Sequence, residues 1–375
     1  MGEEIPKTIW DVPTPAFLVD LDIVKKNCDN MIEKCKKMGV TLRPHMKTHK
    51  TLEGALLMTG GTKRCIVVST LQEAEFYAEN GFEDILLGVI FIENKLKRCQ
   101  ALANKLEEFH LMIDSPQNLE CLERNPLEGG KNWSVFLKID CGYKRCGMPW
   151  DSPETIKFAE QISQSPAVKL KGLYTHCGAT YDSASAEEIK EKSNMFAERM
   201  ASVSNALKAK GIEFSAFGIG STPTASQTGD KVASLINEMH PGNYIFKDME
   251  QVLIGGSTID EIACRLATRV IGHYPHDQRM CTDCGFTALT RQGENSMPGG
   301  FVHIQGEPNL KFTDMSQEVG YVHPIEGSID YEKYPINSLL FFHPYHSCAT
   351  ACCHRVYYVH SGEKIVDIWK PVAGW

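Results

Sequence analysis

Residues 65–89 read CIVVSTLQEAEFYAENGFEDILLGV, and this stretch predicts a strand, a helix and a second strand in succession. The run at 65–69 is rich in β-branched residues, as buried strands are. The segment 71–80 repeats its apolar residues at helical spacing, and a second apolar run follows at 84–89. A strand followed by a helix and another strand is the repeating unit of parallel α/β proteins.

The same alternation continues along most of the chain. The expected strands are Ala16–Leu21, Val40–Arg43, Cys65–Ser69, Asp84–Val89, Phe109–Ile113, Val135–Ile139, Val168–His176 and Phe214–Gly220. The expected helices are Ile23–Lys37, Thr51–Met58, Leu71–Asn80, Asn94–Lys105, Ser115–Glu123, Pro153–Gln164 and Ala186–Lys210. Units of about 30 residues in this number predict a (β/α)₈ barrel of the TIM type, over residues 14–253.

An open, doubly wound sheet is the competing arrangement for such a pattern. Its usual mark is a Gly-x-Gly-x-x-Gly turn after the first strand. This chain has Asp20-Leu21-Asp22 at that place, and we therefore prefer the barrel.

The pattern changes near residue 254, where helical periodicity fades. Short apolar runs bounded by Gly, Pro and Asp follow, which is typical of β-rich domains. They are Leu266–Ile271, Gly300–Gln305, Ser338–Phe342 and Arg355–His360. The sequence therefore predicts a C-terminal β-rich domain over residues 254–375, with residues 1–13 packed against it.

Charge and composition exclude several classes of protein. The chain has 39 Lys and Arg against 47 Asp and Glu, a net charge of −8, which does not suit nucleic-acid binding. No secretory signal and no apolar stretch of about 18 residues is present, and Pro6 stands where a myristoylation signal needs Ser or Thr. With no export signal, its 14 cysteines are expected to be reduced thiols. We expect a cytoplasmic protein without nucleic-acid or membrane partners.

The segment Arg43-Pro44-His45-Met46-Lys47-Thr48-His49-Lys50 follows the second expected strand. The C-terminal ends of barrel strands form the active-site face, so its side chains are expected to face a ligand. Cationic neighbours favour the neutral, nucleophilic form of Lys47, which can attack an aldehyde. A solvated basic loop is the alternative that this turn alone leaves open.

Together with Thr14-Pro15-Ala16-Phe17-Leu18-Val19-Asp20, this segment resembles the opening of fold-type III pyridoxal phosphate (PLP) enzymes, the alanine-racemase-like barrels. Within that group the chain resembles the eukaryotic D-serine dehydratases and the D-threonine aldolases, over nearly its whole length. The resemblance implies that Lys47 holds PLP covalently. It also implies a small-molecule substrate and a homodimer with its sites near the subunit interface.

Two further turns match the cofactor-binding turns of this group. The resemblance implies that Arg145, in Lys138-Ile139-Asp140-Cys141-Gly142-Tyr143-Lys144-Arg145-Cys146-Gly147, lies near the phenolic oxygen of PLP. An ordinary strand-end turn with two glycines at positive φ is the alternative. The resemblance also implies that Tyr174 lies by the pyridine ring and that His176 and Tyr181 line the pocket. Buried tyrosines on barrel strands are, however, often core residues.

Two late loops are expected to bind the cofactor phosphate. Glycines and small hydroxyl residues after late barrel strands let backbone N–H groups approach a phosphate. The loops are Gly218-Ile219-Gly220-Ser221-Thr222-Pro223-Thr224 and His240-Pro241-Gly242-Asn243-Tyr244. Both fall where similar barrels hold the phosphate, so the resemblance makes Thr222, Gly242 and Asn243 the candidates.

The segment His346-Ser347-Cys348-Ala349-Thr350 in the β-rich domain predicts a metal site. On an extended segment, His346 and Cys348 would point the same way, and imidazole with thiolate suits Zn²⁺. In D-serine dehydratases the matching segment binds zinc, whereas D-threonine aldolases carry His-Cys-Asp. A rival closed zinc site would use Cys281, Cys284, Cys352, Cys353 and His354. We interpret Cys281, Cys352 and Cys353 instead as buried apolar thiols.

The resemblance therefore implies a PLP- and zinc-dependent D-serine dehydratase, a lyase that forms pyruvate and ammonia. Its catalytic residues would be Lys47, which removes the α-proton, and His346 and Cys348, which hold a zinc ion that polarises the β-hydroxyl. A metal-dependent D-threonine aldolase-like lyase is one alternative. A non-catalytic PLP-binding protein is the other, although it would have no use for a metal site.

Overall fold

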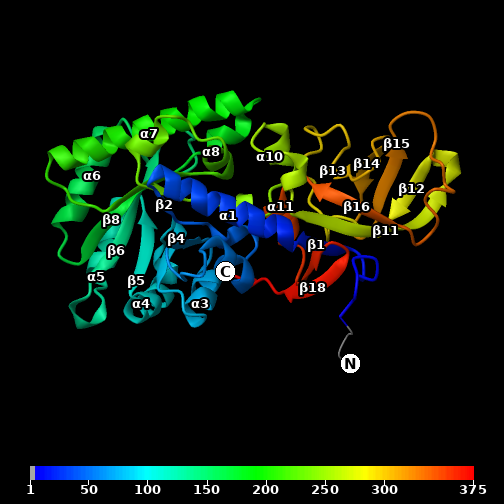
Figure 1. The fold of residues 1–375 in the computed structure, drawn as a ribbon. Helices are drawn as coiled ribbons and strands as arrows, with labels where there is room; N and C mark the ends of the chain where they lie inside the picture. The colour runs from blue at the N-terminus through cyan, green and yellow to red at the C-terminus, as the bar shows by residue number, and fades with distance from the viewer. Residues whose placement is uncertain (1–4) are drawn as a thin grey trace. The chain divides into compact units, whose positions relative to one another are not determined.

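The computed structural model describes residues 5–375, and these form two compact units (Figure 1). One unit contains residues 5–27 together with Ile245–Leu253 and Ser257–Pro371. The other contains Cys28–Tyr244, Ile254–Gly256 and the last residues, Val372–Trp375. We call them the β-rich unit and the barrel unit.

The barrel unit contains eight parallel strands in one sheet. The order is β2-β10-β9-β8-β6-β5-β4-β3, with the two-residue β7 (Met148–Pro149) added to β6. A parallel bridge between His45 and Val67 joins the two ends of this order, with the Val67 N–H donating to Pro44 O at 2.9 Å. The sheet therefore closes into a barrel. The strands are β2 Thr41–Leu42, β3 Ile66–Val68, β4 Asp84–Ile90, β5 Glu108–Ile113, β6 Trp133–Asp140, β8 Val168–His176, β9 Ala216–Gly220 and β10 Glu238–Met239.

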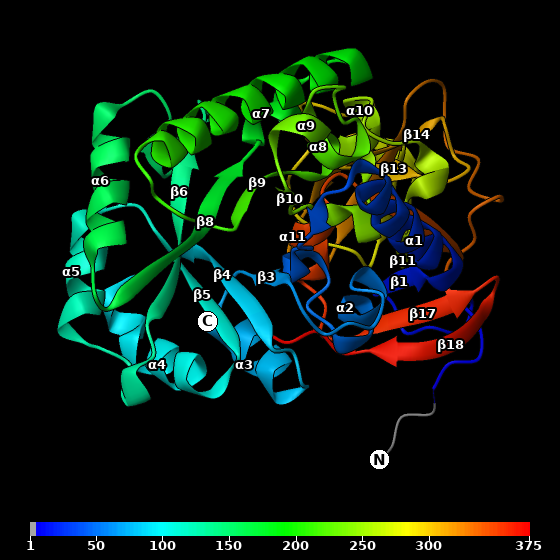
Figure 2. The same ribbon diagram turned by 60° about the vertical axis from the view of Figure 1, so that its left-hand side comes forward.

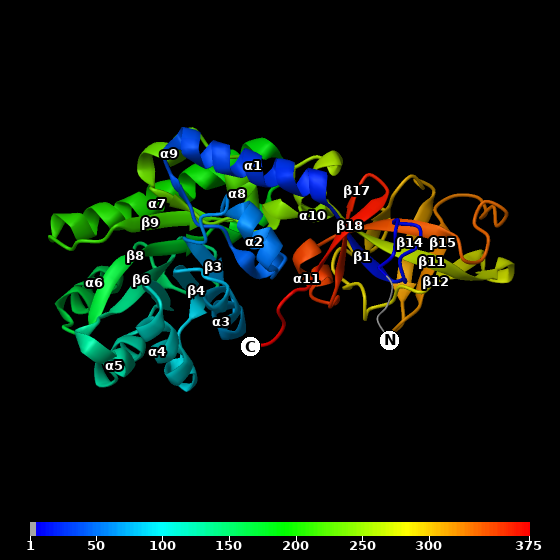
Figure 3. The same ribbon diagram turned by 60° about the horizontal axis from the view of Figure 1, so that its bottom comes forward.

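Helices lie outside these strands, as Figure 2 and Figure 3 show for α3 to α6. All seven expected helices are confirmed: α1 Leu21–Met38, α2 Leu52–Met58, α3 Leu71–Glu79, α4 Leu96–Lys105, α5 Pro116–Arg124, α6 Pro153–Gln164 and α7 Ala186–Ala209. Most begin at a Ser or Thr whose hydroxyl accepts a backbone N–H of the first turn, which fixes where the helix starts. These caps are Thr51, Thr70, Ser115, Ser152 and Ser185. Among the described residues, no helix is both long and apolar enough to cross a membrane.

The interior of the barrel is partly apolar and partly charged. Val67, Leu86, Met112, Phe136, Tyr174 and Ala216 form a buried apolar cluster. The charged part is centred on Arg43, which pairs with Asp84 at 2.6 Å and with Glu238 at 2.9 Å. His110 Nε2 lies 3.3 Å from both Asp84 and Glu108, and Lys171 pairs with Glu108. The carboxylates here already have cationic partners, so we interpret this network as structural.

The β-rich unit is built on a second sheet in the order β14-β15-β12-β11-β1-β17-β18, with β16 pairing to β11 and β13. Its strands are β1 Ala16–Asp20, β11 Cys264–Tyr274, β12 Arg279–Thr282, β13 Val302–Ile304, β14 Leu310–Met315, β15 Gly320–Pro324, β16 Leu339–Pro344, β17 Tyr357–Ser361 and β18 Lys364–Trp369. The predicted combination of a barrel and a C-terminal β-rich part is therefore confirmed.

Two strands differ from the sequence-based expectation. The expected first barrel strand, β1, pairs with β11 and β17 of the β-rich unit instead. The eighth place in the barrel is taken by β10, which was not predicted. The residues of β1 are buried on both faces, as in a barrel strand, so its apolar pattern could not distinguish the two sheets. By contacts, residues 14–27 and 245–253 group with the β-rich unit rather than with the barrel.

Candidate active site

Lys47 lies at the C-terminal end of the barrel strands, in the 3₁₀ turn Met46–Thr48 that follows β2. His45 fixes the start of this turn, because its Nδ1 accepts the Lys47 backbone N–H at 3.3 Å. The His45 N–H in turn donates to Pro241 O at 2.9 Å, in the loop after β10. The backbone of Lys47 is therefore anchored to the strands on both sides of β2.

The cationic neighbours of Lys47 are not those expected from its own segment. Arg43 lies in the charged network inside the barrel, and Lys50 pairs with Glu73 at 3.2 Å. The positive charges that face the site come from Lys138 on β6 and from Arg145. Both groups come from β6 and the turn after it, which do not neighbour β2 in the sheet, so a linear motif around Lys47 could not reveal them.

The electrostatics of two histidines show that these cations lie together. Burial lowers the pKa of His176 well below its usual range, and the positive charges of Arg145, Lys47 and Lys138 lower it further. Burial and the charge of Lys47 have the same effect on the pKa of His45. Among the described residues, no carboxylate forms an ion pair with Lys47, Lys138 or Arg145. The site therefore holds uncompensated positive charge, which suits an anionic ligand.

Lys138 is a second amine in the site. Burial lowers its pKa to about 8, and Arg145 and Lys47 act in the same direction while the thiol of Cys146 opposes them. Its Nζ lies 4.2 Å from the centre of the Tyr174 ring. It is therefore a lysine of reduced basicity within the same strand-end region as Lys47.

The turn that carries Arg145 is held by two carboxylates. Asp140 accepts the N–H groups of Gly142 at 2.8 Å and of Lys144 at 3.0 Å, and Asp114 accepts the Gly147 N–H at 3.1 Å. Gly142 and Gly147 have φ of 111° and 113°, conformations that favour glycine. The two glycines therefore have the positive φ expected of an ordinary strand-end turn. They also shape the loop that carries Arg145.

Arg145 and His176 line one small pocket with Lys138, Tyr143 and Thr175. Tyr143, which was not predicted, has its ring edge-on to His176 with 5.7 Å between centroids. The Arg145 guanidinium lies 5.7 Å from the centre of that same ring. The structure therefore brings Arg145 and His176 together through a tyrosine.

The two predicted tyrosines lie in different surroundings. Tyr174 belongs to the apolar cluster of the barrel, and its ring stacks on His240 with 3.6 Å between centroids. That environment matches the core alternative, so a role beside the pyridine ring stays a prediction. Tyr181 lies in the 3₁₀ turn Gly178–Asp182, and the centre of its ring is 6.3 Å from the centre of the His176 ring. It is the tyrosine of this pair that borders the histidine of the site.

The two predicted phosphate loops lie side by side. They follow β9 and β10, which pair in parallel through Gly218 with Glu238 and Ile219 with Met239. The Tyr244 N–H donates to Thr222 Oγ1 at 3.1 Å and links the loops directly. Gly242 packs against the turn before Lys47, because a Cβ there would meet His45 O at 2.9 Å. Thr222, Gly242 and Asn243 are all buried at this junction.

These features fit PLP, a ring with a phosphate and an aldehyde. The amine of Lys47, the uncompensated charges of Lys138 and Arg145, and the two linked loops supply the donors that such a ligand needs. We propose that these donors bind the charged groups of the cofactor.

A metal-ligand cluster lies in the β-rich unit. Ligand atoms of Asp248, Glu250 and His346 lie within 4.8 Å of one another. Cys348 is not a member of this group, but its thiol interacts with the neighbouring His346 side chain. Burial disfavours the charged imidazole, but Cys348, Asp248 and Glu250 together raise the pKa of His346 well above its usual range. An imidazole with carboxylates around it and a thiol beside it provides ligand types that suit Zn²⁺.

His346 and Cys348 do not lie on an extended segment, as we expected. His346 is the N-cap of the short helix α11 (Ser347–Ala351), and Cys348 lies in its first turn. The two side chains still meet, because a cap residue and the first helical turn can present neighbouring atoms to one point. The expected geometry was wrong, whereas the expected juxtaposition is present.

Asp248 and Glu250 were missed by the sequence analysis. Asp248 is fully buried and accepts the N–H groups of Gln251 at 3.2 Å and Ser347 at 2.8 Å, so it caps two helices that are distant in sequence. These are α10 (Met249–Leu253) and α11. Glu250 Oε2 lies 3.1 Å from His346 Nδ1. Acidic residues in a short, unpredicted helix gave no recognisable pattern.

The rival zinc site is not supported by the described residues. Among residues 5–375, the two groups of side chains placed closely enough to hold a metal are that of Asp248 and that of Asp84 in the charged network of the barrel. Neither group contains Cys281, Cys284, Cys352 or Cys353. His354 Nε2 hydrogen-bonds the carbonyl of Ala288 at 2.9 Å instead. Cys281 is buried as expected, but Cys352 is exposed and Cys353 is half-buried, so that part of the interpretation was wrong.

Comparison with known proteins places this arrangement in a family. Residues 19–250 match the alanine racemase N-terminal domain, and residues 263–360 match a serine dehydratase domain. The chain is 32% identical to D-serine dehydratase of Dictyostelium discoideum, over 98% of both chains. The chain belongs to the D-serine dehydratase family of alanine-racemase-like enzymes.

Structural similarity extends beyond the D-serine dehydratases to a dehydratase named for another substrate. The D-threo-3-hydroxyaspartate dehydratase from Delftia sp. HT23 superimposes with a TM-score of 0.92 at 26% identity, over 98% of this chain and 100% of that one. A single-residue variant of that dehydratase has a metal-free form, which superimposes with a TM-score of 0.91 at 26% identity, over 98% and 100% of the two chains. The barrel and the β-rich part of the D-serine dehydratase family are thus shared with a metal-binding dehydratase.

Proposed function

We propose that this chain is a D-serine dehydratase that forms pyruvate and ammonia, with PLP on Lys47 and zinc on His346 and Cys348. The observation that carries the proposal is the cluster of Asp248, Glu250 and His346, with the thiol of Cys348 beside the imidazole. It occurs in a chain that matches D-serine dehydratases over its whole length. A PLP carrier would need no such cluster, so it supports an enzyme.

When bound, PLP supplies an electron sink that acidifies the Cα proton of an attached amino acid. Lys47 then has two tasks: its amine holds the cofactor, and once released it accepts that proton. The positive charges of Lys138 and Arg145 lie in the same strand-end region as Lys47, where they suit the anionic groups of the cofactor. The buried loops with Thr222, Gly242 and Asn243, and the side chains of Tyr174 and Tyr181, would hold and orient the cofactor.

A zinc ion would supply a Lewis acid that polarises the β-hydroxyl, since hydroxide is a poor leaving group. His346 and Cys348 would bind the ion. Glu250 accepts the His346 Nδ1 proton, which leaves Nε2 as the nitrogen available to a metal. Asp248 fixes the backbone of Ser347, between the two ligands.

An assay of product classes tests this function. The purified, PLP-loaded protein is incubated with D-serine, L-serine and both D-threonine isomers, and 2-oxo acids, ammonia and glycine are measured. We expect pyruvate and ammonia in equal amounts from D-serine and none from L-serine. Glycine and an aldehyde from D-threonine, with no 2-oxo acid, would identify an aldolase. No turnover of any substrate by protein that holds both PLP and zinc would support the carrier.

We also propose that the protein acts in the cytoplasm as a homodimer, as the family resemblance implies. Light scattering during size-exclusion chromatography should give twice the mass of one chain. A monomer mass at micromolar concentration would contradict the dimer.

A further inference from the structure

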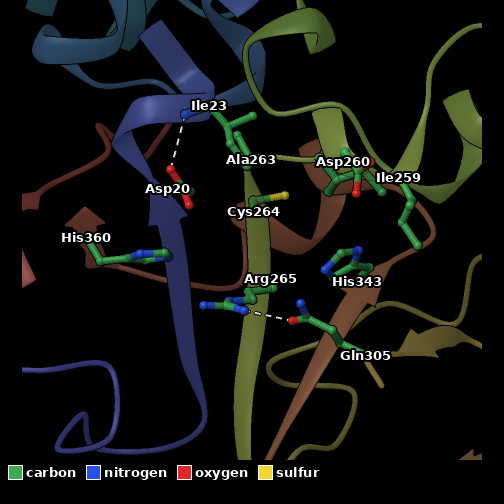
Figure 4. A pocket seen from close by; sticks show the side chains of 11 residues that line it. Asp20, Ile23, Ile259, Asp260, Ala263, Cys264, Arg265, Gln305, His343 and His360 are labelled. Atoms are coloured by element: carbon green, nitrogen blue, oxygen red, sulfur yellow. Dashed lines mark hydrogen bonds between the residues drawn. The ribbon is translucent and has the colours of Figure 1, made fainter. Parts of the chain in front are cut away.

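A separate cavity lies within the β-rich unit and contains none of the candidate site residues. Its volume is about 330 Å³, near the lower limit of the roughly 300–1,000 Å³ that small-molecule sites have. It is lined by Asp20, Ile23, Ile259, Asp260, Ile262, Ala263, Cys264, Arg265, Gln305, His343 and His360 (Figure 4). A cavity of this size suits a small ligand.

Arg265 is the central charge of this cavity. Its Nη1 donates to Gln305 Oε1 at 2.7 Å, whereas its Nε is buried and has no hydrogen-bond partner. Among the described residues, no carboxylate lies within ion-pair distance of this guanidinium, in contrast to Arg43 and Arg98. The Cζ atom of Arg265 lies 4.4 Å from the centre of the Phe341 ring, so the guanidinium packs against this ring. A half-buried arginine with a fixed plane and an unpaired, buried Nε is suited to bind an anion.

Two histidines add polar atoms to the same cavity. His343 is 7% exposed, and its Nδ1 is buried without a hydrogen-bond partner. His360 is 2% exposed, and its Nδ1 hydrogen-bonds the carbonyl of Gly362 at 2.8 Å, so its other ring nitrogen is left for a ligand. Nearly all buried polar atoms in proteins are hydrogen-bonded, so an unused atom beside a cavity indicates a missing partner.

The acidic groups of the cavity are engaged or solvated. Asp20 Oδ1 accepts the N–H groups of Asp22 at 3.0 Å and Ile23 at 3.1 Å, at the start of α1. Asp260 is exposed to solvent. Both charges oppose an anion, but neither lies within ion-pair distance of Arg265. The remaining wall is apolar, with Ile23, Ile259 and Ile262.

We infer that this cavity is a binding site for a small organic carboxylate with a short apolar tail. Nε and Nη2 of Arg265 form the planar fork that binds both oxygens of a carboxylate, and Arg98 uses the same two atoms for Glu75 in this protein. Nη1 stays with Gln305. The histidines provide additional polar contacts, and the isoleucines receive the tail.

Calorimetry on the purified, PLP-loaded protein tests the site with 3-methylbutanoate as the probe. We expect saturable binding that D-serine does not displace, because no cavity residue belongs to the candidate active site. The neutral 3-methylbutanamide should bind at least about tenfold more weakly, since it cannot pair with the guanidinium. Inorganic phosphate binding as tightly as the carboxylate would overturn the carboxylate assignment, and displacement by D-serine would overturn the separate site.

Three variants locate the binding. Arg265→Gln should weaken binding of 3-methylbutanoate at least about tenfold. Arg269→Gln, on the same strand but outside the cavity, is the matched control and should bind as the parent does. Gln305→Glu keeps the cavity and places a carboxylate beside Arg265, so it should abolish binding without loss of thermal stability. Unchanged affinity in a folded Arg265→Gln or Gln305→Glu protein would refute the site.

Discussion

The carboxylate of Glu250 lies 3.1 Å from Nδ1 of His346, although the two residues are 96 positions apart in the chain. A carboxylate at this nitrogen fixes both the tautomer and the orientation of the imidazole. The opposite nitrogen, Nε2, would then be the one that binds a metal. Glu250 is therefore a positioning residue for the proposed zinc ligand.

We predict that Glu250→Gln binds zinc about 10- to 100-fold more weakly than the parent protein. The amide cannot hold the imidazole as a carboxylate does. Competition with a chromophoric chelator measures the dissociation constant directly, without any activity assay. Glu326→Gln, an exposed position in the same unit, is the control. Equal zinc affinity in the Glu250 and Glu326 variants would remove Glu250 from the site.

We predict that borohydride reduction of the PLP-loaded protein leaves a pyridoxyl group on Lys47. Lys47 is half-buried at the strand ends, in the turn that follows β2. Peptide mapping by mass spectrometry identifies the modified lysine. Lys138 is the informative competitor, because burial lowers its pKa to about 8. An adduct on Lys138 or Lys50 would contradict the assignment of Lys47.

We predict that Cys348→Ala loses D-serine turnover by about 10³-fold or more, which corresponds to several kcal/mol of barrier. The same variant should retain much of its activity on β-chloro-D-alanine, because chloride leaves without a Lewis acid. Pyruvate formation from both substrates gives the comparison. Equal losses on the two substrates would show that the metal supports the pocket rather than the leaving group.

We predict a pH-dependent contribution of Glu108 to stability. Hydrogen bonding to His110 is the first cause that lowers the pKa of Glu108 from 4.5 to about 2, and Lys171 acts in the same direction against partial burial. A carboxyl whose pKa is lower in the folded state stabilises the protein above its unfolded pKa and loses this effect as the pH falls toward the folded pKa. The parent should therefore exceed Glu108→Gln in free energy of unfolding at pH 7.

Denaturant unfolding at several pH values measures this difference. The gap between parent and variant should shrink as the pH falls from about 4.5 to about 2. Glu107→Gln, at the neighbouring exposed position, is the control and should show a smaller gap. A gap that does not change over this range would show that Glu108 acts through packing rather than charge.

The helices and strands that could be predicted from the sequence are those long enough to show a hydrophobic periodicity. Every expected helix exists, because each is seven to 24 residues long, and Ser or Thr caps mark the start of most of them. The strand β10 has two residues, Glu238 and Met239, and no periodic signal can be read from so short an element. It belongs to the barrel only because β2 and β9 pair with it on either side.

The candidate site was predictable where one segment contains the chemistry and not where distant segments meet. Lys47, His346 and Cys348 stand in recognisable motifs. Asp248 and Glu250 reach His346 only through the packing of α10 on α11. Tyr143 reaches His176 because a turn after β6 folds over the end of β8.

The bridge between His45 and Val67 has a consequence for how the barrel opens. Lys47 lies two residues from the backbone bridge that joins the segment after β2 to β3, and on its other side β2 pairs with the short strand β10. Fluctuations that open this bridge would also displace the lysine. A ligand bound to Lys47 would therefore keep this part of the barrel closed. The Val67 N–H donates to Pro44 O across the bridge, so its hydrogen exchange would be slower in the ligand-bound protein than in the free protein.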